Sequence, residues 1–246
     1  MNIQNKKVLV TGGGSGIGFS IAKAFADKGN EVILFGRTED RLKTAVAQLP
    51  NASYVVGDVT NEKDVLELVK QVKEKYDGID ILVNNAGTAR LQLLDASVNI
   101  YDSAKFEIEI NYLSVLRLTE LLLPTLKARK EAAIINIQSI VSYVPNAFIA
   151  TYSATKAALH SYSQSLRLTL EKSAPNVKVF EVFPPFVDTD LTKGLEGDKL
   201  TPTEVADDII RSVESDSYAV RNGGTKDLYQ LFRQSPEEAL VALNNR

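Results

Sequence analysis

KVLVTGGGSGIG, residues 7–18, is the stretch that decides the fold of this chain. Residues 7–11 are a short apolar run, which is typical of a strand buried on both faces of a parallel sheet. Five glycines follow within residues 12–18, and an apolar stripe from Ile21 to Ala26 then indicates a helix. After Gly29-Asn30 ends that helix, residues 31–35 predict a second strand. The beginning of the chain therefore predicts a βαβ unit.

The alternation of strand and helix continues along the rest of the chain. Further strands are predicted at 53–56, 79–83, 133–137, 177–183 and 218–220. Helices are predicted from Thr38 to about 49 and from Thr60 to about 77, with both threonines as caps, and then over 102–129, 152–172, 202–215 and 225–243, whereas residues 88–101 are expected to be irregular. This pattern predicts one α/β domain over residues 1–246, a Rossmann-type doubly wound parallel sheet of about seven strands with helices on both faces.

Composition narrows the classes of function. The chain has 246 residues, of which 44% are hydrophobic and 24% charged, and these values suit a single globular domain. The net charge of -3, without a basic tail, argues against a nucleic-acid partner. Because the chain has no cysteine and one histidine, we predict no disulfide and no metal site. No signal peptide and no membrane-spanning run of about eighteen apolar residues is recognised, so a cytoplasmic location is expected.

The glycine-rich turn predicts a phosphate site. Glycines let the backbone turn tightly and let a pyrophosphate approach, and the following helix N-terminus offers free N–H groups. The alternative is a tight turn that only packs on the sheet. The number of glycines in a βαβ context favours dinucleotide binding, and the lack of a Gly-Lys-Ser/Thr ending argues against a P-loop. The predicted contacts are Gly12, Gly14, Ser15, Gly16, Ile17 and Gly18.

The end of the second predicted strand bears on the choice of cofactor. An acidic residue there would bind both ribose hydroxyls of NAD, but the chain has Gly36-Arg37. Arg37 can bind a 2′-phosphate, with help from Arg41, so NADP(H) is favoured and NAD(H) stays the alternative. Arg37 can also be read as a solvated loop charge. Asp58, after the third strand, either accepts from the adenine amino group or caps the next helix.

Tyr152 and Lys156 form the candidate catalytic pair, because four residues place them one helical turn apart. Carbonyl reduction by a nicotinamide needs a proton donor and a stabilised oxyanion. The ordinary pKa of tyrosine is about 10, and we expect the Lys156 cation to lower it. Ser139, at the end of the fifth strand, can hydrogen-bond the substrate oxygen, and Ser142 is less favoured. His160 is interpreted as a packing or interface residue.

Three motifs together carry a resemblance. Thr11-Gly12-x-x-x-Gly16-x-Gly18, Asn84-Asn85-Ala86-Gly87 and Tyr152-x-x-x-Lys156 occur in the order and spacing of the classical short-chain dehydrogenase/reductase family, which the chain resembles over nearly its whole length. The C-terminal part, with Phe183-Pro184-Pro185 and residues 224–245, is similar to the bacterial oxidoreductases encoded beside the D-alanyl-lipoteichoic-acid genes.

The resemblance implies further site residues. Asn111 would be a fourth catalytic residue that holds a water linking Lys156 to solvent, unless it is only an exposed polar position. Lys156 would also hold the nicotinamide ribose. Pro185 replaces a usual glycine and Phe183 a frequent asparagine, which would make this loop stiffer and one donor poorer. The further cofactor contacts implied are Val59, Asn85, Ala86, Gly87, Pro184, Val187 and Thr189.

These features predict an NADP-dependent oxidoreductase acting on a carbonyl or secondary alcohol of unknown identity. The alternative is a catalytically silent NAD(P)-binding regulatory or scaffold protein. Substrate walls are expected from 88–95, 140–149 and 186–200, the last as a mobile loop. An apolar pocket is predicted from Leu91, Leu93, Val141, Tyr143, Val144, Phe148, Phe186, Leu191 and Leu195. The resemblance also implies a homodimer or homotetramer, formed through the helices near 102–129 and 152–172.

Overall fold

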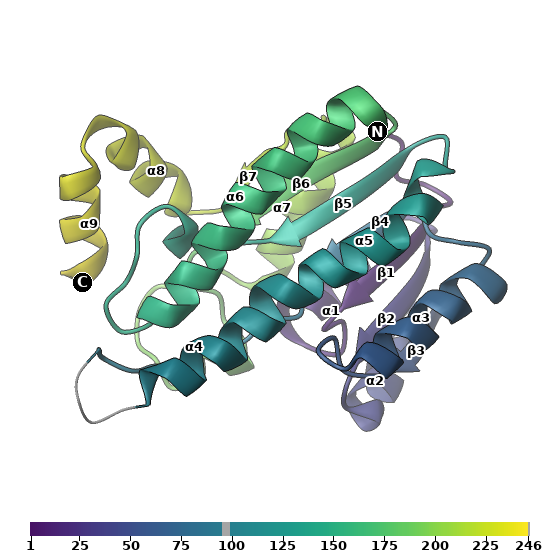
Figure 1. The fold of residues 1–246 in the computed structure, drawn as a ribbon, viewed down its shortest axis with the longest axis horizontal. Coiled ribbons are helices and arrows are strands. Elements are labelled where there is room, and N and C mark those ends of the chain that lie inside the picture. Colours follow the sequence, from purple (N-terminus) through teal and green to yellow (C-terminus); the bar gives the residue numbers. More distant parts are fainter. Residues whose placement is uncertain (95–98, 246) are drawn as a thin grey trace.

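The computed structural model describes residues 1–94 and 99–245. Its centre is a parallel sheet of seven strands in the order β3-β2-β1-β4-β5-β6-β7 (Figure 1). The strands are β1 (Lys7–Thr11), β2 (Glu31–Gly36), β3 (Ala52–Val56), β4 (Ile81–Asn84), β5 (Ala132–Ile137), β6 (Val177–Phe183) and β7 (Ala219–Arg221). This arrangement confirms the predicted Rossmann-type, doubly wound sheet.

Helices cover both faces of the sheet. They are α1 (Gly16–Ala26), α2 (Glu39–Val46), α3 (Glu62–Glu74), α4 (Ile100–Ile108), α5 (Ser114–Lys127), α6 (Ala150–Ser173), α7 (Pro202–Glu214), α8 (Thr225–Gln234) and α9 (Pro236–Asn244). In Figure 1, α4, α5 and α6 lie in front of the sheet, whereas α1 and α7 lie behind it. The last two helices, α8 and α9, extend beyond one end of the sheet.

Two hydrophobic cores follow from the alternation of side chains along each strand. In β1, Val8 and Val10 pack with α1 and α7, whereas Leu9 packs on the opposite face with α3, α5 and α6. All three side chains are fully buried. A central strand of this kind needs apolar residues at consecutive positions, which is why the sequence shows a continuous run rather than an alternating one.

Several predicted boundaries were wrong in detail. The helix expected over 102–129 contains a π-helical turn, Glu109–Leu113, between α4 and α5. Asn61 rather than Thr60 caps α3, because its side chain accepts from the N–H groups of Lys63 and Asp64. Thr38 precedes α2 without a side-chain capping bond.

Three further limits of the prediction concern the ends of elements. The C-terminal helix divides at Ser235, because Pro236 cannot donate a helical hydrogen bond and begins α9 instead. The fourth strand begins at Ile81 rather than at residue 79, and α2 ends at Val46 rather than near residue 49. Residues 95–98, part of the segment expected to be irregular, lie outside the described residues, and residue 95 is also the last of the predicted wall 88–95.

The strand order creates a crevice between β1 and β4. The chain runs outward from β1 through β2 to β3 and then returns to β4 on the other side of β1. Ligands of such sheets bind at the carboxyl ends of the strands at this switch point. Thr11 joins the two strand ends, because its hydroxyl accepts from the N–H groups of Asn85 and Ala86, both at 3.0 Å.

A buried polar network joins β4, β5 and α6 behind this crevice. The Asn84 amide donates to Asn136 Oδ1 at 2.9 Å, and the Asn136 amide donates to Ser163 Oγ at 2.8 Å. Ser163 in turn donates to the Leu159 carbonyl within α6. These three polar side chains are almost completely buried, and their bonds to one another compensate for part of the loss of water, although Asn84 Oδ1 has no partner among the described residues.

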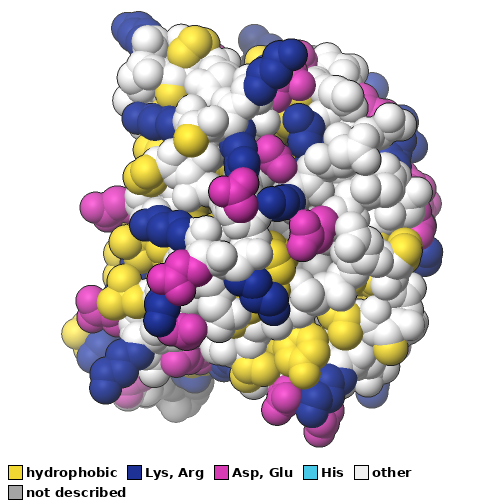
Figure 2. All heavy atoms as spheres, turned by 90° about the vertical axis from the view of Figure 1, so that its right-hand side faces the viewer, with side chains coloured by type: hydrophobic (Ala, Val, Ile, Leu, Met, Phe, Trp, Pro, Cys, Tyr) yellow, Lys and Arg dark blue, Asp and Glu magenta, His cyan; other side chains and the backbone are white. Residues whose placement is uncertain are grey.

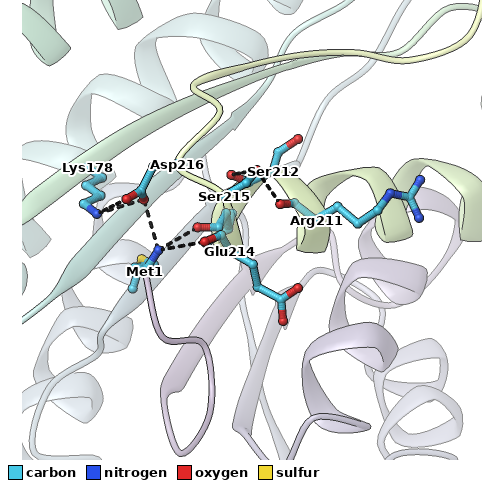
Figure 3. Close-up of polar contacts among 8 residues, drawn as sticks. Met1, Lys178, Arg211, Ser212, Glu214, Ser215 and Asp216 are labelled. Carbon is cyan, nitrogen blue, oxygen red and sulfur yellow. Dashed lines mark hydrogen bonds and ion pairs between the residues drawn. The ribbon is translucent and has the colours of Figure 1, made fainter.

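The first residue is tied to the far edge of the sheet (Figure 3). The Met1 ammonium donates to the Val213 carbonyl at 2.9 Å and to Asp216 Oδ1 at 3.0 Å, and Lys178 binds the same carboxylate. On the face drawn in Figure 2, basic and acidic side chains are interspersed. Among the described residues, none of the helices combines the length and the apolar character needed to cross a bilayer.

Candidate active site

A cleft of about 500 Å³ runs along the carboxyl ends of the strands. One end lies over the glycine turn and Arg37, and the other reaches Ser139, Tyr152 and Lys156. The structure thus brings together the residues predicted for cofactor binding and most of those predicted for catalysis. The predicted residues along its walls are Gly12, Gly14, Ser15, Gly16, Ile17, Gly18, Arg37, Asp58, Val59, Asn85, Ala86, Gly87, Ser139, Tyr152, Lys156, Pro184, Val187 and Thr189.

The glycine turn is shaped to receive an anionic group. Gly12 and Gly16 have φ of 65° and 53°, in the left-handed region that favours glycine. A Cβ atom on Gly18 would lie 2.3 Å from the Gly12 carbonyl oxygen, so only glycine fits there. Helix α1 has no acidic residue in its first turn, and the Ser15 hydroxyl makes no capping bond. The free N–H groups and partial positive charge of this helix end therefore face the cleft and fit a pyrophosphate.

The end of the cleft at which the sequence predicts the adenosine is lined by exposed charges. β2 ends at Gly36, and the Arg37 side chain that follows is 68% exposed, with its Nη1 3.8 Å from Asp58 Oδ2. Asp58 Oδ1 accepts from the N–H and hydroxyl of Thr60, at 2.9 and 2.8 Å. Asp58 therefore stabilises the turn before α3 but does not cap that helix, which leaves its other oxygen directed at Arg37.

Lys156 is a buried cation of the site. Its side chain is nearly completely buried, and Nζ donates to the Ile137 carbonyl at the end of β5 at 2.7 Å. Nζ lies 5.6 Å from the centre of the Tyr152 ring. Burial disfavours the cation and lowers the pKa of Lys156 to about 8.

The expectation of a lowered pKa for Tyr152 was wrong for this arrangement, although Lys156 Nζ lies beside its ring. Burial raises the pKa of Tyr152 to about 12, and the negative charge of Glu107 adds to the increase. A hydrogen bond with Ser139 acts in the opposite direction but does not overcome burial. Helical spacing places the two side chains on one face, but it does not say that the ammonium binds a backbone carbonyl.

Ser139 is fixed by the short turn that follows β5. It precedes the 3₁₀ turn Ile140–Ser142, and its Oγ accepts from Val141 N–H at 3.3 Å. Ser142 Oγ accepts from Ser139 N–H at 3.2 Å, so Ser142 supports the turn and does not line the cleft. The Ile140 N–H donates to the Pro184 carbonyl, which holds this turn against the end of β6.

Asn111 lies in the π-helical turn and is fully buried, so the alternative of an exposed polar position was wrong. Its amide donates to the Thr88 carbonyl at 2.8 Å and to Thr155 Oγ1 at 3.1 Å, and its Oδ1 accepts from Thr88 N–H at 2.9 Å. A Cβ atom on Gly87 would lie 3.3 Å from Asn111 Oδ1 and 3.8 Å from Lys156 Nζ. The absence of a side chain at Gly87 leaves room between these two groups.

The loop after β6 closes the cleft on its remaining side. Pro184, Pro185, Val187 and Thr189 line it, and Thr189 Oγ1 donates weakly to the Val187 carbonyl at 3.4 Å. Segment 186–200 folds back on itself, because Asp188 N–H donates to the Leu200 carbonyl and Leu200 N–H donates to the Phe186 carbonyl, both at 2.9 Å.

The profile of the short chain dehydrogenase family matches residues 6–200. This chain belongs to that family. A family member from Bacillus subtilis, the uncharacterized oxidoreductase DltE, is 38% identical over 194 residues, which are 78% of this chain and 76% of the relative. That similarity confirms the predicted resemblance to oxidoreductases encoded beside the D-alanyl-lipoteichoic-acid genes.

Solved structures of other family members share the fold. A short chain dehydrogenase from Burkholderia cenocepacia in complex with NADP is 27% identical, with a TM-score of 0.86 and 98% of each chain covered. The 3-ketoacyl-(acyl-carrier-protein) reductase from Brucella melitensis, complexed with NADH, is 25% identical, with a TM-score of 0.81 over 89% of this chain and 97% of that chain. The chain is therefore an NAD(P)-dependent oxidoreductase of the short chain dehydrogenase family, and the bound cofactor differs among its structural neighbours.

The residues predicted for an apolar substrate wall lie in different surroundings. Of the nine, Leu191 is the one that lines the described cleft. Val141 and Val144 are buried in the core, whereas Leu91, Leu93 and Phe148 are exposed. Phe183 is also fully buried and stacks on Tyr143, with ring centres 4.5 Å apart. It therefore packs beneath the loop that begins at Pro184 and is not part of the cleft wall. Apolar character alone does not distinguish a core residue from a cleft residue.

His160 is a packing residue, as predicted. Its Nδ1 lies 2.5 Å from Glu181 Oε2, and its ring meets Tyr143 edge-on.

Sequence reasoning missed the roles of Thr11 and Glu107. Thr11 is the last residue of the buried strand β1, and a hydroxyl at that position was a usable signal. Glu107 is fully buried on α4, accepts from Arg90 N–H at 2.6 Å, and carries no signal in the local sequence.

Proposed function

We propose that this chain is an NADP-dependent oxidoreductase that transfers a hydride between the nicotinamide and a carbonyl or secondary alcohol, with Tyr152 as the general acid or base. The observation that carries this proposal is the meeting of Ser139, Tyr152 and Lys156 at one end of a cleft that begins over the glycine turn. A nicotinamide cofactor held by the residues of this cleft would supply the hydride, and Tyr152 would supply the proton.

Cofactor preference is proposed from the adenosine end. Gly36 ends β2 without a carboxylate, so no negative charge at that position repels a 2′-phosphate. Arg37 and Arg41 both line the cleft and can bind a phosphate by charged hydrogen bonds. Asp58 lies near Arg37 and can accept from the adenine amino group through its second oxygen. NAD(H) is the alternative that an affinity comparison would distinguish.

Proton transfer is assigned to Tyr152. In the reduction of a carbonyl, the phenol donates its proton to the substrate oxygen while the Ser139 hydroxyl hydrogen-bonds that oxygen. With a pKa raised to about 12, the phenol is protonated at neutral pH, and the Lys156 ammonium, with a pKa near 8, is charged. The cation stabilises the phenolate that remains after transfer. In alcohol oxidation the same groups act in reverse.

Reprotonation of Tyr152 is assigned to a path through Lys156. Asn111 Oδ1 and Lys156 Nζ both face the space beside Gly87, and a water there could bridge them. Asn111 is held on three sides by Thr88 and Thr155, so its position is well defined. We assign Asn111 to the support of this water and Lys156 to the transfer of its proton.

The test is an NADPH-oxidation screen over diverse ketones and aldehydes, with Tyr152→Phe as the decisive variant. A general acid contributes roughly 10²- to 10⁴-fold, so Tyr152→Phe should lose at least about 100-fold in kcat at an unchanged Tm. Tyr101→Phe, on an exposed ring, is the matched control and should retain full activity. Turnover that survives in Tyr152→Phe would refute the mechanism. A wild-type chain that binds NADPH and reduces no carbonyl would favour the regulatory or scaffold alternative.

We also propose a cytoplasmic homo-oligomer that forms through α5 and α6. Leu113, directly before α5, and Leu168, on α6, are 39% and 59% exposed, so this face offers apolar surface to a second copy. Sedimentation velocity at micromolar concentration distinguishes a monomer from a dimer or tetramer, and Leu168→Glu should shift the distribution toward monomer.

A further inference from the structure

An ion pair crosses the mouth of the cleft above the glycine turn. Arg41 on α2 and Asp190, which begins the 3₁₀ turn Asp190–Thr192, are 149 residues apart in sequence, yet Arg41 Nη1 lies 3.0 Å from Asp190 Oδ2. Both residues line the cleft. A Cβ atom on Gly14 would lie 3.5 Å from Arg41 Cβ, and one on Gly16 would lie 3.2 Å from Thr189 Cγ2. The two sides of the ion pair therefore stand directly over the turn.

The charges at this end of the cleft are already paired. Arg37 faces Asp58 at 3.8 Å, beyond hydrogen-bond distance, whereas Arg41 makes a direct bond to Asp190. A second hollow of about 380 Å³ borders the pair and is lined by Ser15, Arg41 and Asp190 among others. A phosphate that enters from the cleft thus meets Arg41 only in competition with a carboxylate. The pair is 59% and 66% exposed, and exposed ion pairs are weak, so a dianionic phosphate can displace Asp190.

We propose that Asp190 is a specificity-determining residue that holds Arg41 in the free protein and yields it to the 2′-phosphate of NADP(H), which releases segment 186–200. This inference rests on the proposed NADP preference and extends it to the substrate side of the cleft. A phosphate accepts two hydrogen bonds from one guanidinium and carries more charge than a carboxylate. Once Arg41 binds the phosphate, the Asp190 carboxylate is left without its cation and is repelled by the bound phosphate.

Release of Asp190 from Arg41 would free the whole of segment 186–200 to move. Leu191, the next residue, lines the cleft and is 47% exposed. The segment contains Gly194 and Gly197, with φ of 80° and 131°, at which the backbone can turn freely. Its own bonds, such as Lys199 Nζ to the Thr192 carbonyl, lie within the segment and do not tie it to α2. The Arg41–Asp190 bond therefore joins cofactor recognition to the position of Leu191 in the wall of the cleft.

The experiment uses adenosine 2′,5′-bisphosphate and AMP, which differ in the 2′-phosphate and carry no nicotinamide. Calorimetric titration of wild type and Asp190→Asn should show the bisphosphate binding about three- to fivefold more tightly to the variant, since an exposed pair no longer competes. The affinity for AMP should stay within about twofold. Asp198→Asn, at an exposed carboxylate of the same segment, is the matched control and should behave as wild type.

Trypsin cleavage after the exposed Lys193 reports on the segment itself. In wild type, the bisphosphate should accelerate cleavage and AMP should not. In Asp190→Asn, cleavage should be fast without ligand and insensitive to the bisphosphate. Equal affinities and equal cleavage in the two proteins would overturn the inference, as would protection of Lys193 by the bisphosphate. A wild type that binds AMP and the bisphosphate equally would instead refute the proposed NADP preference.

Discussion

Both ends of the cleft carry cationic side chains, but these are buried at one end and exposed at the other. At the catalytic end, Lys156 and Asn111 are buried and bonded to fixed backbone groups, Lys156 to the Ile137 carbonyl and Asn111 to Thr88. At the adenosine end, Arg37 and Arg41 are exposed and meet only carboxylates. The end at Lys156 holds its side chains in fixed positions, whereas the end at Arg37 offers mobile positive charge.

The difference follows from what each end has to do. Proton transfer requires donor and acceptor within hydrogen-bond distance, so small displacements are costly. Discrimination of a phosphate acts through charge, which tolerates motion of long side chains and weakens with salt. We therefore expect substitutions at buried, close-packed positions to have large effects on binding or turnover, and those at the exposed end to change selectivity with little effect on stability.

The largest effect is expected where backbone approaches backbone. In Gly18→Ala the new Cβ would lie 2.3 Å from the Gly12 carbonyl oxygen and 2.4 Å from Asn85 Nδ2. Forcing it in should cost about 1–3 kcal/mol of folding free energy and weaken NADPH binding by at least about 100-fold. Gly224→Ala, with open space around its Cβ, is the control and should change neither quantity. Thermal unfolding measures the loss of stability, and NADPH fluorescence titration measures the loss of affinity. A Gly18→Ala protein that binds NADPH normally would contradict the expected difference between close-packed and exposed positions.

Asn111→Ala separates positioning from stability at the catalytic end. Loss of the amide leaves the Thr88 N–H without its partner, so unfolding free energy should fall by about 1–3 kcal/mol and kcat by about 10- to 100-fold. Asn61→Ala, which removes the exposed cap of α3, should cost about 1 kcal/mol and leave kcat unchanged. Urea unfolding and steady-state kinetics on both variants test this. If the two variants lost activity equally, instability alone would explain the effect.

Arg37→Asp tests the charged end. A carboxylate at this position should repel a 2′-phosphate and bind ribose hydroxyls, so the ratio of kcat/KM for NADPH to that for NADH should fall by about 10- to 100-fold. Tm should change little, because Arg37 is 68% exposed. Arg233→Asp, on the exposed side of α8, is the control. An unchanged cofactor ratio in Arg37→Asp would remove this residue from cofactor selection.

The pH dependence of carbonyl reduction sharpens the contrast further. The pKa of Lys156 is lowered to about 8, so its charge is present below that pH and is lost above it. Since the pKa of Tyr152 is raised to about 12, the phenol stays protonated over this range. We expect kcat to be flat below about pH 7.5 and to fall roughly tenfold between pH 8.5 and 9.5. In Lys156→Arg the guanidinium stays charged, so the fall should move above pH 10. A profile that is the same in both proteins would contradict the assignment.

The fold was predictable because its signals are local and repeated. The apolar run at residues 7–11, the glycines after it and the alternation of strand and helix each follow from backbone chemistry. The same holds for the placement of Ser139 beside the glycine turn, since carboxyl ends of parallel strands share one edge of the sheet. The cap at Asn61 rather than Thr60 was missed because both residues can cap, and the geometry of the preceding turn at Asp58 decides between them.

The burial of individual side chains could not be predicted from the sequence. The spacing of Tyr152 and Lys156 gave the helical face but not the burial that sets both pKa values. Leu91 and Val141 both have aliphatic side chains, yet Leu91 is exposed and Val141 is buried in the core. Glu107 and the Asn84–Asn136 pair depend on contacts between segments far apart in the chain, so no window of sequence contains them.

The Asn84–Asn136–Ser163 network has a consequence for how the sheet assembles. β4 and β5 are rich in aliphatic side chains, and a slip of two residues would return the same faces to the same cores. In the native alignment Asn84 lies opposite Asn136, 52 residues away along the chain. A slipped pairing would bury both amides without partners, at about 1–3 kcal/mol for each unpaired group. The amide pair thus favours the native strand register, because shifted registers that suit the aliphatic residues equally well would leave both amides unpaired.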